Sequence, residues 1–247
     1  MSNRVRLKKA PIVEALIDLM LGPQHTVDLK NLKILADQLS GEFPKCDEIR
    51  IAQLKLPPSG SGIAPEVSHL PPVGYKLTSS NGSEVVQLKT DGFTFNQLPP
   101  YQDWDYFFRR FKHLWELYQK TAKATELRRV GLRYINNLQL PLPLKFLKDY
   151  LAAPPVVPAG MPQEISDYVM RVVVPLADIS GGAIITQALG RGPHSGQLPL
   201  ILDIDVFTER AIKTADKTLW DLLLKMREHK NNIFYKSITE KTVELYS

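Results

Sequence analysis

Two aspartates at alternate positions of one predicted strand, Asp203 and Asp205, are the residues of this chain best suited to metal chemistry. Their strand reads LILDIDVF, and side chains two residues apart on a strand project from the same face, about 7 Å apart. Paired carboxylates can hold a divalent metal for phosphoryl transfer. The alternatives are that the pair lies on a solvated strand face or neutralises an arginine. No further metal ligand stands out in the sequence.

Two arginines, Arg129 and Arg133, lie on one face of a second predicted strand, RRVGLRYINN, whose other face is apolar. Guanidinium groups make forked contacts with phosphate or carboxylate, and Gly131 between them allows a ligand or a neighbouring backbone to approach closely. Four residues of strand span about 13 Å, roughly twice the separation of the two aspartates. We therefore expect the aspartates to neutralise at most one of these arginines. The other is left for Glu126, water or a ligand outside the chain.

The basic residues of the chain are concentrated between positions 109 and 133. This stretch holds eight Lys or Arg residues and two Glu residues, so its net charge of +6 accounts for the whole +5 of the chain. Such a concentration predicts a surface that binds an acidic protein partner or nucleic acid, although no recognisable nucleic-acid-binding motif is present. The residues predicted to form this surface are Arg109, Lys120, Arg128, Arg129, Arg133 and Asn137.

Other catalytic and metal-binding arrangements are not indicated. Cys46 is the only cysteine, which excludes an internal disulfide and a cysteine-based zinc cluster. The five histidines lack the spacing of zinc ligands, and no G-x-S-x-G nucleophile motif occurs. We therefore expect no cofactor, with a divalent metal at the two aspartates as the alternative.

Length and composition predict a soluble, cytoplasmic protein. A chain of 247 residues with 44% hydrophobic content is ample for a packed core, and its 23% charged residues are usual for a globular protein. No apolar run reaches the roughly 18 residues of a membrane span, and Glu14 and Asp18 interrupt what would be a signal-peptide core. We expect no membrane association, and the sequence leaves the oligomeric state open.

The first part of the chain predicts strands with two covering helices. Asn81-Gly82 and Asp91-Gly92 are strong hairpin turns and predict an antiparallel meander. An aromatic stripe at helical spacing predicts a helix over 104–122, with Asp103 as its N-cap. The Pro-rich stretch 57–72 is expected to be a loop. The remaining predicted elements are strands at 11–21, 47–56 and 128–137 and a helix over 28–43.

The second part repeats the order of strands followed by a Trp-bearing helix, which hints at an internal duplication. A Pro-rich connection, 141–164, separates an N-terminal half, 1–140, from a C-terminal half, 165–247, and carries a short helix near 144–151. Strands are expected within 167–179, 183–190 and 198–207, a helix over 218–230, and a last short helix with Ser237 and Glu240 as a capping box. The predicted fold class is α+β, mainly antiparallel sheet with amphipathic helices on one face, as two halves or one continuous domain.

Several segments resemble a sporadically distributed, functionally uncharacterised prokaryotic protein family of similar length. They are KAPIVEALIDL, EVVQLKTDGFTFNQLPPY, RVGLRYINNL and LWDLLLKMREHKNNIFYKSIT, and RVGLRYINN is the most distinctive. The resemblance implies no activity, substrate or catalytic residue. The scattered occurrence of that family implies an accessory gene in a mobile or defence-related locus.

Three functions follow from these features. The first is a non-enzymatic binding or regulatory protein that engages an acidic protein or nucleic acid through the basic surface. The second is a metal-dependent phosphoryl-transfer enzyme that uses Asp203 and Asp205. The third is a small-molecule sensor with a cavity between the sheet and the aromatic helix.

Overall fold

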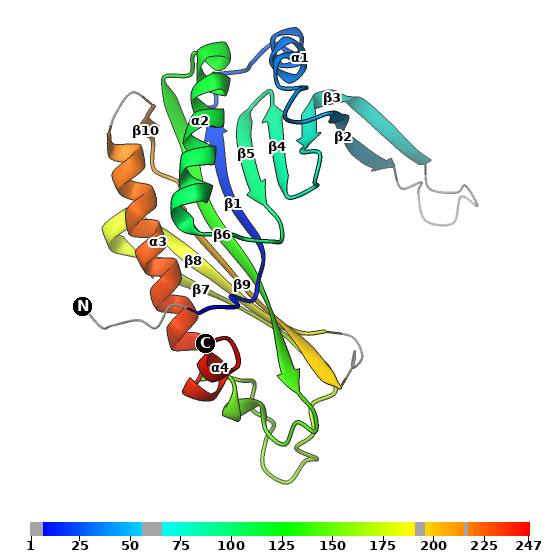
Figure 1. The fold of residues 1–247 in the computed structure, drawn as a ribbon, viewed down its shortest axis with the longest axis vertical. Helices are drawn as coiled ribbons and strands as arrows, with labels where there is room; N and C mark the ends of the chain where they lie inside the picture. The colour runs from blue at the N-terminus through cyan, green and yellow to red at the C-terminus, as the bar shows by residue number, and fades with distance from the viewer. Residues whose placement is uncertain (1–6, 56–65, 191–195, 215–216) are drawn as a thin grey trace.

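The fold is one antiparallel sheet with helices on one of its faces, and a computed structural model shows it (Figure 1). The structure describes residues 7–55, 66–190, 196–214 and 217–247. The strands are β1 (Ile12–Leu21), β2 (Lys45–Lys55), β3 (Glu66–Thr78), β4 (Glu84–Lys89), β5 (Gly92–Gln97), β6 (Glu126–Pro141), β7 (Val169–Leu176), β8 (Gly181–Leu189), β9 (Gln197–Thr208) and β10 (Ile212–Lys213). The helices are α1 (Leu29–Gln38), α2 (Trp104–Ala122), α3 (Thr218–Ser237) and α4 (Glu240–Leu245), with short 3₁₀ turns at Leu147–Asp149 and Ala177–Ile179. The predicted α+β class is confirmed.

The sheet order is β2-β3-β4-β5-β1-β6-β9-β8-β7, with β10 paired to the start of β6. β1 and β6 are adjacent at its centre, and Ile17 lies opposite Leu132. Each of these two strands also pairs with the last strand of an antiparallel meander, β2-β3-β4-β5 or β7-β8-β9, and each meander precedes a long helix. The chain therefore repeats one topology about the β1/β6 pair. The Pro-rich segment 141–164 does not separate two sheets, and the second repeat begins with β6 rather than after it.

The two long helices, α2 and α3, lie side by side on the same face of the sheet (Figure 1). Asp103 caps α2 as predicted, because its carboxylate accepts a hydrogen bond of 2.8 Å from the Tyr106 backbone N–H. The apolar stripe of α2 packs on β5, where Phe93 and Phe95 are fully buried. Trp220 of α3 packs edge-on against Phe108 and Phe111 of α2, so aromatic rings fill the space between the helices.

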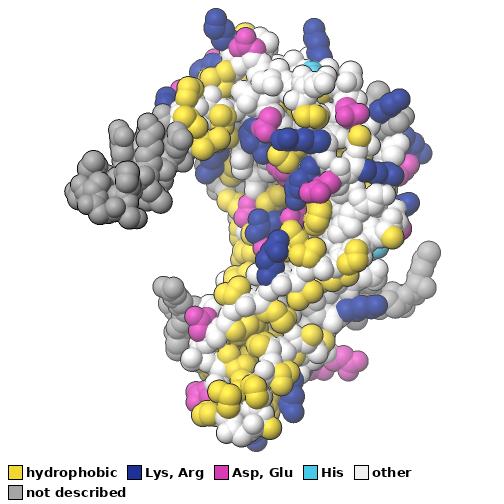
Figure 2. Space-filling model, turned by 180° about the vertical axis from the view of Figure 1, so that it is seen from behind, with side chains coloured by type: hydrophobic (Ala, Val, Ile, Leu, Met, Phe, Trp, Pro, Cys, Tyr) yellow, Lys and Arg dark blue, Asp and Glu magenta, His cyan; other side chains and the backbone are white. Residues whose placement is uncertain are grey.

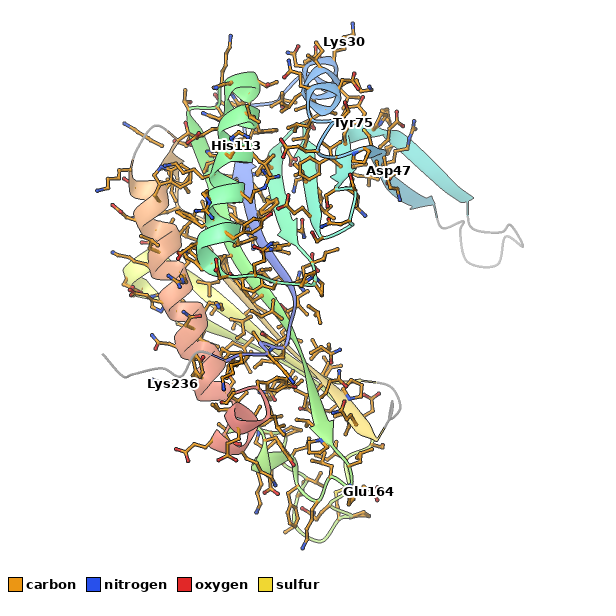
Figure 3. The ribbon with its side chains drawn as sticks, in the orientation of Figure 1. Lys30, Asp47, Tyr75, His113, Glu164 and Lys236 are labelled. Carbon is orange, nitrogen blue, oxygen red and sulfur yellow. The ribbon has the colours of Figure 1, made fainter. Side chains whose placement is uncertain are left out.

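Side chains divide cleanly between the two faces of the sheet. Tyr75 of β3 is buried beneath α1, whereas Lys30 on α1 points away from the sheet (Figure 3). On β6, Val130, Leu132 and Tyr134 are buried on the helix side, and the alternate residues lie on the face that no helix covers within the described part of the chain. We call this second face the open face.

Three local predictions need correction. The expected loop 57–72 is strand from Glu66 onward, because β-bulges in the β2-β3 ladder near Arg50 accommodate Pro71 and Pro72; residues 56–65 lie outside the described part. The helix expected near 144–151 is only a single 3₁₀ turn. The last helix is capped by Thr239, not by a Ser237 box, because α3 continues through Ser237.

Candidate functional site

Arg133 on the open face is held by Asp203 of the neighbouring strand β9. Its Nε donates to Oδ1 at 2.8 Å and its Nη2 donates to Oδ2 at 2.6 Å, which is the forked geometry expected of an arginine and a carboxylate. The residue directly across the ladder from Arg133 is Asp205, not Asp203. The side chain of Arg133 therefore extends two residues along the ladder, to the position opposite Ile135, to reach Asp203.

Arg129 is also paired within the molecule, and it bridges two strands. Its Nη1 donates to Asp18 of β1 at 3.2 Å, and its Nη2 donates to Asp205 of β9 at 3.1 Å. The guanidinium folds over Gly131, where an ideal Cβ would lie only 2.7 Å from Nη1. The expectation that the aspartates would neutralise at most one arginine is wrong. The spacing of the strand residues suggested that Asp205 was too far from Arg129, but the long Arg129 side chain lies over Gly131 and reaches it.

The ion pairs extend into a network across five strands of the open face. Asp18 also accepts hydrogen bonds from Thr94 Oγ1 on β5 at 2.6 Å and from Lys89 Nζ on β4 at 3.0 Å. Burial raises the pKa of Asp205, and the guanidinium groups of Arg129 and Arg133 only partly offset that effect. Figure 2 shows Lys and Arg side chains interleaved with Asp and Glu side chains across the middle of this face.

The two carboxylates predicted to hold a metal, Asp203 and Asp205, thus accept hydrogen bonds from arginines instead. Among the described residues, no group of three or more His, Cys, Asp or Glu side chains is arranged to hold a metal ion. The hypothesis of a metal site at Asp203 and Asp205 is therefore not supported, because a guanidinium occupies the position beside each carboxylate that a metal ion would take.

The other residues predicted to form the basic surface are dispersed. Arg109 and Lys120 lie on α2, on the helix side of the sheet, whereas Arg129, Arg133 and Asn137 lie on the open face. Arg128 pairs with Asp91 at 3.3 Å beside an irregularity in the β1-β6 ladder. The stretch 109–133 is continuous in sequence, but a helix followed by a strand places its two ends on opposite faces of the sheet. The six residues therefore do not form one surface.

Arg110, on the side of α2 near β4, is neutralised by carboxylates and so adds no free positive charge to the basic stretch. Its guanidinium donates to both carboxylate oxygens of Glu84, at 2.8–3.3 Å, and to Glu42 at 2.8 Å. Tyr106 Oη donates to the same Glu84 carboxylate at 2.8 Å. Glu84 is buried, so Arg110 is needed to neutralise a carboxylate inside the protein and is not available to bind a partner.

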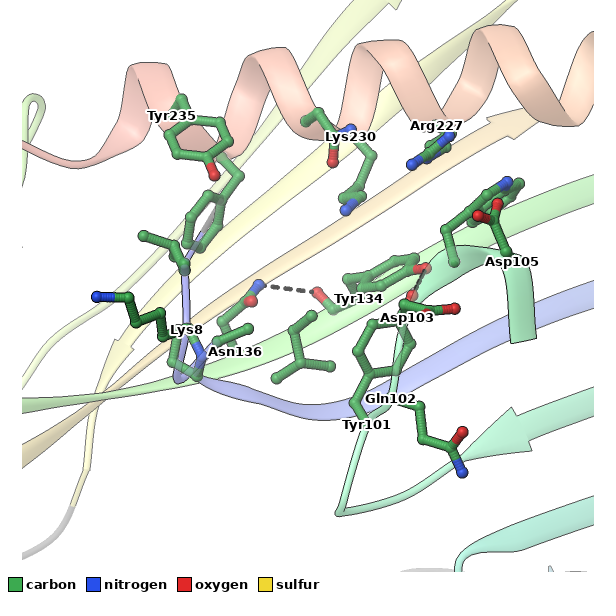
Figure 4. Close-up of a pocket in the computed structure, with 17 residues that line it drawn as sticks. Lys8, Tyr101, Gln102, Asp103, Asp105, Tyr134, Asn136, Arg227, Lys230 and Tyr235 are labelled. Atoms are coloured by element: carbon green, nitrogen blue, oxygen red, sulfur yellow. Dashed lines mark hydrogen bonds between the residues drawn. The ribbon is translucent and has the colours of Figure 1, made fainter. Parts of the chain in front are cut away.

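A cavity lies between the sheet and the helices, where the two repeats meet. It is a cleft of about 710 Å³, within the range typical of small-molecule sites. Four separate segments line it: the approach to β1, the loop and first turn of α2, the middle of β6, and the second half of α3 (Figure 4). Its main lining residues are Lys8, Ile12, Tyr101, Asp103, Trp104, Asp105, Tyr134, Asn136, Arg227, Lys230, Asn231, Phe234 and Tyr235.

The floor of the cleft is a pair of tyrosines. The hydroxyls of Tyr101 and Tyr134 lie 2.9 Å apart, and their rings meet edge to face. Burial raises the pKa of Tyr101 to about 12 and raises the pKa of Tyr134 still more clearly above its ordinary value. Both phenols are therefore neutral near pH 7. Only one of them donates within the pair, and among the described residues no acceptor is recorded for the second hydroxyl proton.

Two cations of α3 lie against aromatic rings of this cleft. Lys230 Nζ is 3.9 Å from the centroid of the Tyr134 ring, and the Arg227 guanidinium is 5.0 Å from the Trp104 ring. Figure 4 shows Lys230 extending from α3 toward Tyr134 and Asn136. Asn136 is buried and donates to the Leu202 carbonyl at 3.0 Å, which fixes its amide at the floor. The cleft thus combines aromatic rings, the fixed amide of Asn136, the cations of α3 and the carboxylates of Asp103 and Asp105.

The individual residues of this cleft were not singled out from the sequence, although a cavity between the sheet and the aromatic helix was one of the three hypotheses. The signal that was present is a cluster of cations and aromatic residues in the second half of α3. Its pattern resembles an ordinary amphipathic helix, and the other lining segments are distant in sequence.

Comparison with protein-family models gives no match to this chain, and comparison with curated proteins gives no similar sequence. The family resemblance therefore stays a prediction. Among the described residues, no helix is both long enough and apolar enough to cross a membrane.

Proposed function

We propose that the protein is a non-catalytic binding protein whose ligand occupies the cleft between α2 and α3. The observation that carries the proposal is the convergence of four segments, from both repeats, on one cavity of about 710 Å³ with a tyrosine floor and two cations on its wall. A ligand there would contact both repeats at once. Such a position suits a sensor, because binding would stabilise one arrangement of α2 against α3.

The lining favours a small ring-bearing anion. Arg227 and Lys230 supply positive charge on the α3 side, and the rings of Trp104 and Tyr134 supply flat apolar contacts beneath them. The hydroxyl proton that the tyrosine pair does not use internally suits an acceptor on the ligand. Asp103 and Asp105 at the start of α2 also line the cleft and disfavour negative charge on the α2 side, so we place the anionic group nearer to α3 (Figure 4).

Anilinonaphthalene sulfonate, a ring-bearing sulfonate, is a suitable first probe. Calorimetry and probe fluorescence should show one site per chain, and Arg227→Met and Lys230→Met should each weaken binding about tenfold, the equivalent of about 1.4 kcal/mol. Lys225→Met is the matched control, because Lys225 lies exposed on the same helix outside the cleft. Equal binding by all three variants would locate the probe elsewhere and remove the cleft as the site.

A second candidate function is contact with an acidic protein or nucleic acid through the outer side of α2. Within the described residues, Arg109 and Lys120 take part in no ion pair, in contrast to the arginines of the open face. If nucleic acid is the partner, affinity should fall steeply with salt, and each phosphate contact removed by Arg109→Ala or Lys120→Ala should reduce the salt slope by about 0.9. Absence of DNA and RNA binding at low salt would exclude nucleic acid as the partner.

A further inference from the structure

Strand β7 ends the sheet with apolar side chains exposed on both faces. Val169 and Val173 on the open face are 74% and 51% exposed, and Val172 and Val174 on the helix side are 43% and 38% exposed. An exposed, valine-rich edge strand is a ready template for pairing with another strand, and folded proteins usually protect such edges with charge. Arg171 is the one charged residue of β7.

The backbone groups that β7 offers can be identified from its pairing with β8. The Tyr168 carbonyl accepts from the N–H of Leu189 on β8, so Tyr168 and Leu189 occupy a hydrogen-bonded position of the ladder. Hydrogen-bonded and non-hydrogen-bonded pairs alternate along an antiparallel ladder. The N–H and C=O groups of Val169, Arg171 and Val173 must therefore point outward, away from β8. Pro175 occupies the next outward position. Proline has no N–H, and because this position faces away from β8, the sheet loses no hydrogen bond there.

The opposite edge of the sheet has the protection that β7 lacks. The described side chains of β2 include Lys45, Asp47, Glu48 and Arg50, all charged and exposed or partly exposed. The contrast between the two edges singles out β7 as the one whose surface is suited to strand pairing.

We propose that β7 pairs with β7 of a second copy of this chain, antiparallel and about a twofold axis at Val172. A second copy is the fitting occupant because the strand is complementary to itself in this register. Arg171 then lies opposite Val173 of the second copy, and each donates an outward N–H to the carbonyl of the other. Val169 donates to the carbonyl of Pro175 in the second copy. Apolar side chains meet on both faces, and every outward N–H of the strand is used.

The register follows from charge. An axis at Arg171 would place two guanidinium groups directly opposite each other, which is unfavourable on adjacent strands. An axis at Val173 would place Val169 beyond the end of β7 in the second copy, so its outward N–H would have no acceptor in that strand. The axis at Val172 avoids both costs. Because β8 and β9 separate β7 from β6, the pairing surface is distinct from the cleft and does not depend on its ligand.

Cross-linking tests both the partner and the register. In the proposed pairing, the two Val172 residues form a non-hydrogen-bonded pair at the axis, with Cα atoms about 4.5 Å apart, which permits a disulfide. With the exposed Cys46 replaced by serine, Val172→Cys should give a covalent dimer on mild oxidation. Val156→Cys in the same background is the control, since Val156 is 89% exposed but lies outside β7. Equal cross-linking of both variants, or of neither, would overturn the proposal.

A charge exchange provides an independent test in solution. The full chain should sediment at twice its mass of 27.9 kDa and dissociate on dilution. Val173→Lys places an ammonium opposite Arg171 of the second copy and should weaken the dimer at least about tenfold. Adding Arg171→Glu should restore it, because opposite charges then face each other, and Val156→Lys should have no effect. A chain of single mass at all concentrations, or a double variant no better than Val173→Lys, would contradict this pairing.

Discussion

The guanidinium of Arg129 lies directly over Gly131, two residues along the same strand, and reaches carboxylates on both neighbouring strands. The missing side chain of Gly131 is what opens this path. The pair ties β1, β6 and β9 together at the centre of the sheet, where the two repeats meet.

Gly131→Ala should therefore destabilise the protein by displacing Arg129. We expect a loss of about 1 kcal/mol, because two hydrogen bonds to carboxylates are weakened, while the alanine itself restricts the unfolded chain and offsets part of that loss. In an Arg129→Ala background the same substitution should be neutral or stabilising by about 0.5 kcal/mol. Urea unfolding of the four proteins measures the coupling. An equal effect in both backgrounds would show that Arg129 is not what the new methyl group disturbs.

Much of the fold could be predicted because its signals are local. The aromatic stripe of α2, its cap at Asp103 and the turns at Asn81-Gly82 and Asp91-Gly92 all depend on residues within a few positions of one another. The alternation of RRVGLRYINN likewise identified the apolar and charged faces of β6. Such patterns fix each element but not its neighbours in the sheet.

The site could not be predicted in the same way, because it depends on segments that only the topology brings together. Arg129 and Asp205 are 76 positions apart, and their contact needed the order β1-β6-β9 and a side chain folded over glycine. The cleft depends even more on the topology, because Tyr101, Tyr134 and Lys230 come from a loop, a strand and a helix that are distant in sequence. Each has an ordinary role in its own element and becomes part of a site only in the fold.

Arg110 and Arg109, adjacent on α2, should differ sharply in their contribution to stability. Arg110→Ala leaves the buried Glu84 carboxylate with a hydrogen bond from Tyr106 but no cation, and should cost about 3 kcal/mol. Arg109→Ala removes an exposed side chain and should change stability by less than about 0.5 kcal/mol. Thermal and urea unfolding of the two variants measure this difference. Similar losses for both would show that Glu84 is not held by Arg110.

The buried carboxyl of Asp205 should make stability depend on pH in mildly acidic solution. Burial raises its pKa in the folded protein above that in the unfolded chain, so the folded state holds the proton more tightly between the two values. The contribution of Asp205 is therefore fully present below the unfolded pKa and is lost as pH rises through the folded pKa, by at most about 1.4 kcal/mol per pH unit.

Asp205→Asn removes that titration and provides the measurement. The stability of the unsubstituted protein relative to this variant should fall as pH rises from about 4 through the raised pKa. Asp18, Asp203, Arg129 and Arg133 are present in both proteins, so the comparison reports the titration of Asp205 together with its coupling to these charges. A relative stability that instead rises over this range would mean that the guanidinium groups outweigh burial and lower the pKa.

Tyr101→Phe should weaken binding of anilinonaphthalene sulfonate without unfolding the cleft. The substitution keeps the ring that packs on Tyr134 but removes the hydroxyl of Tyr101, the more exposed of the two tyrosines. The remaining Tyr134 hydroxyl is buried, so the ligand loses the accessible donor while the apolar floor persists. We expect affinity to fall about fivefold, equivalent to about 1 kcal/mol for one neutral hydrogen bond. Tyr106→Phe is the matched control, because its hydroxyl serves Glu84 outside the cleft and its loss should affect stability but not the probe. Unchanged affinity in Tyr101→Phe, together with a loss in Lys230→Met, would assign recognition to the α3 cations alone; unchanged affinity in both would place the probe outside the cleft.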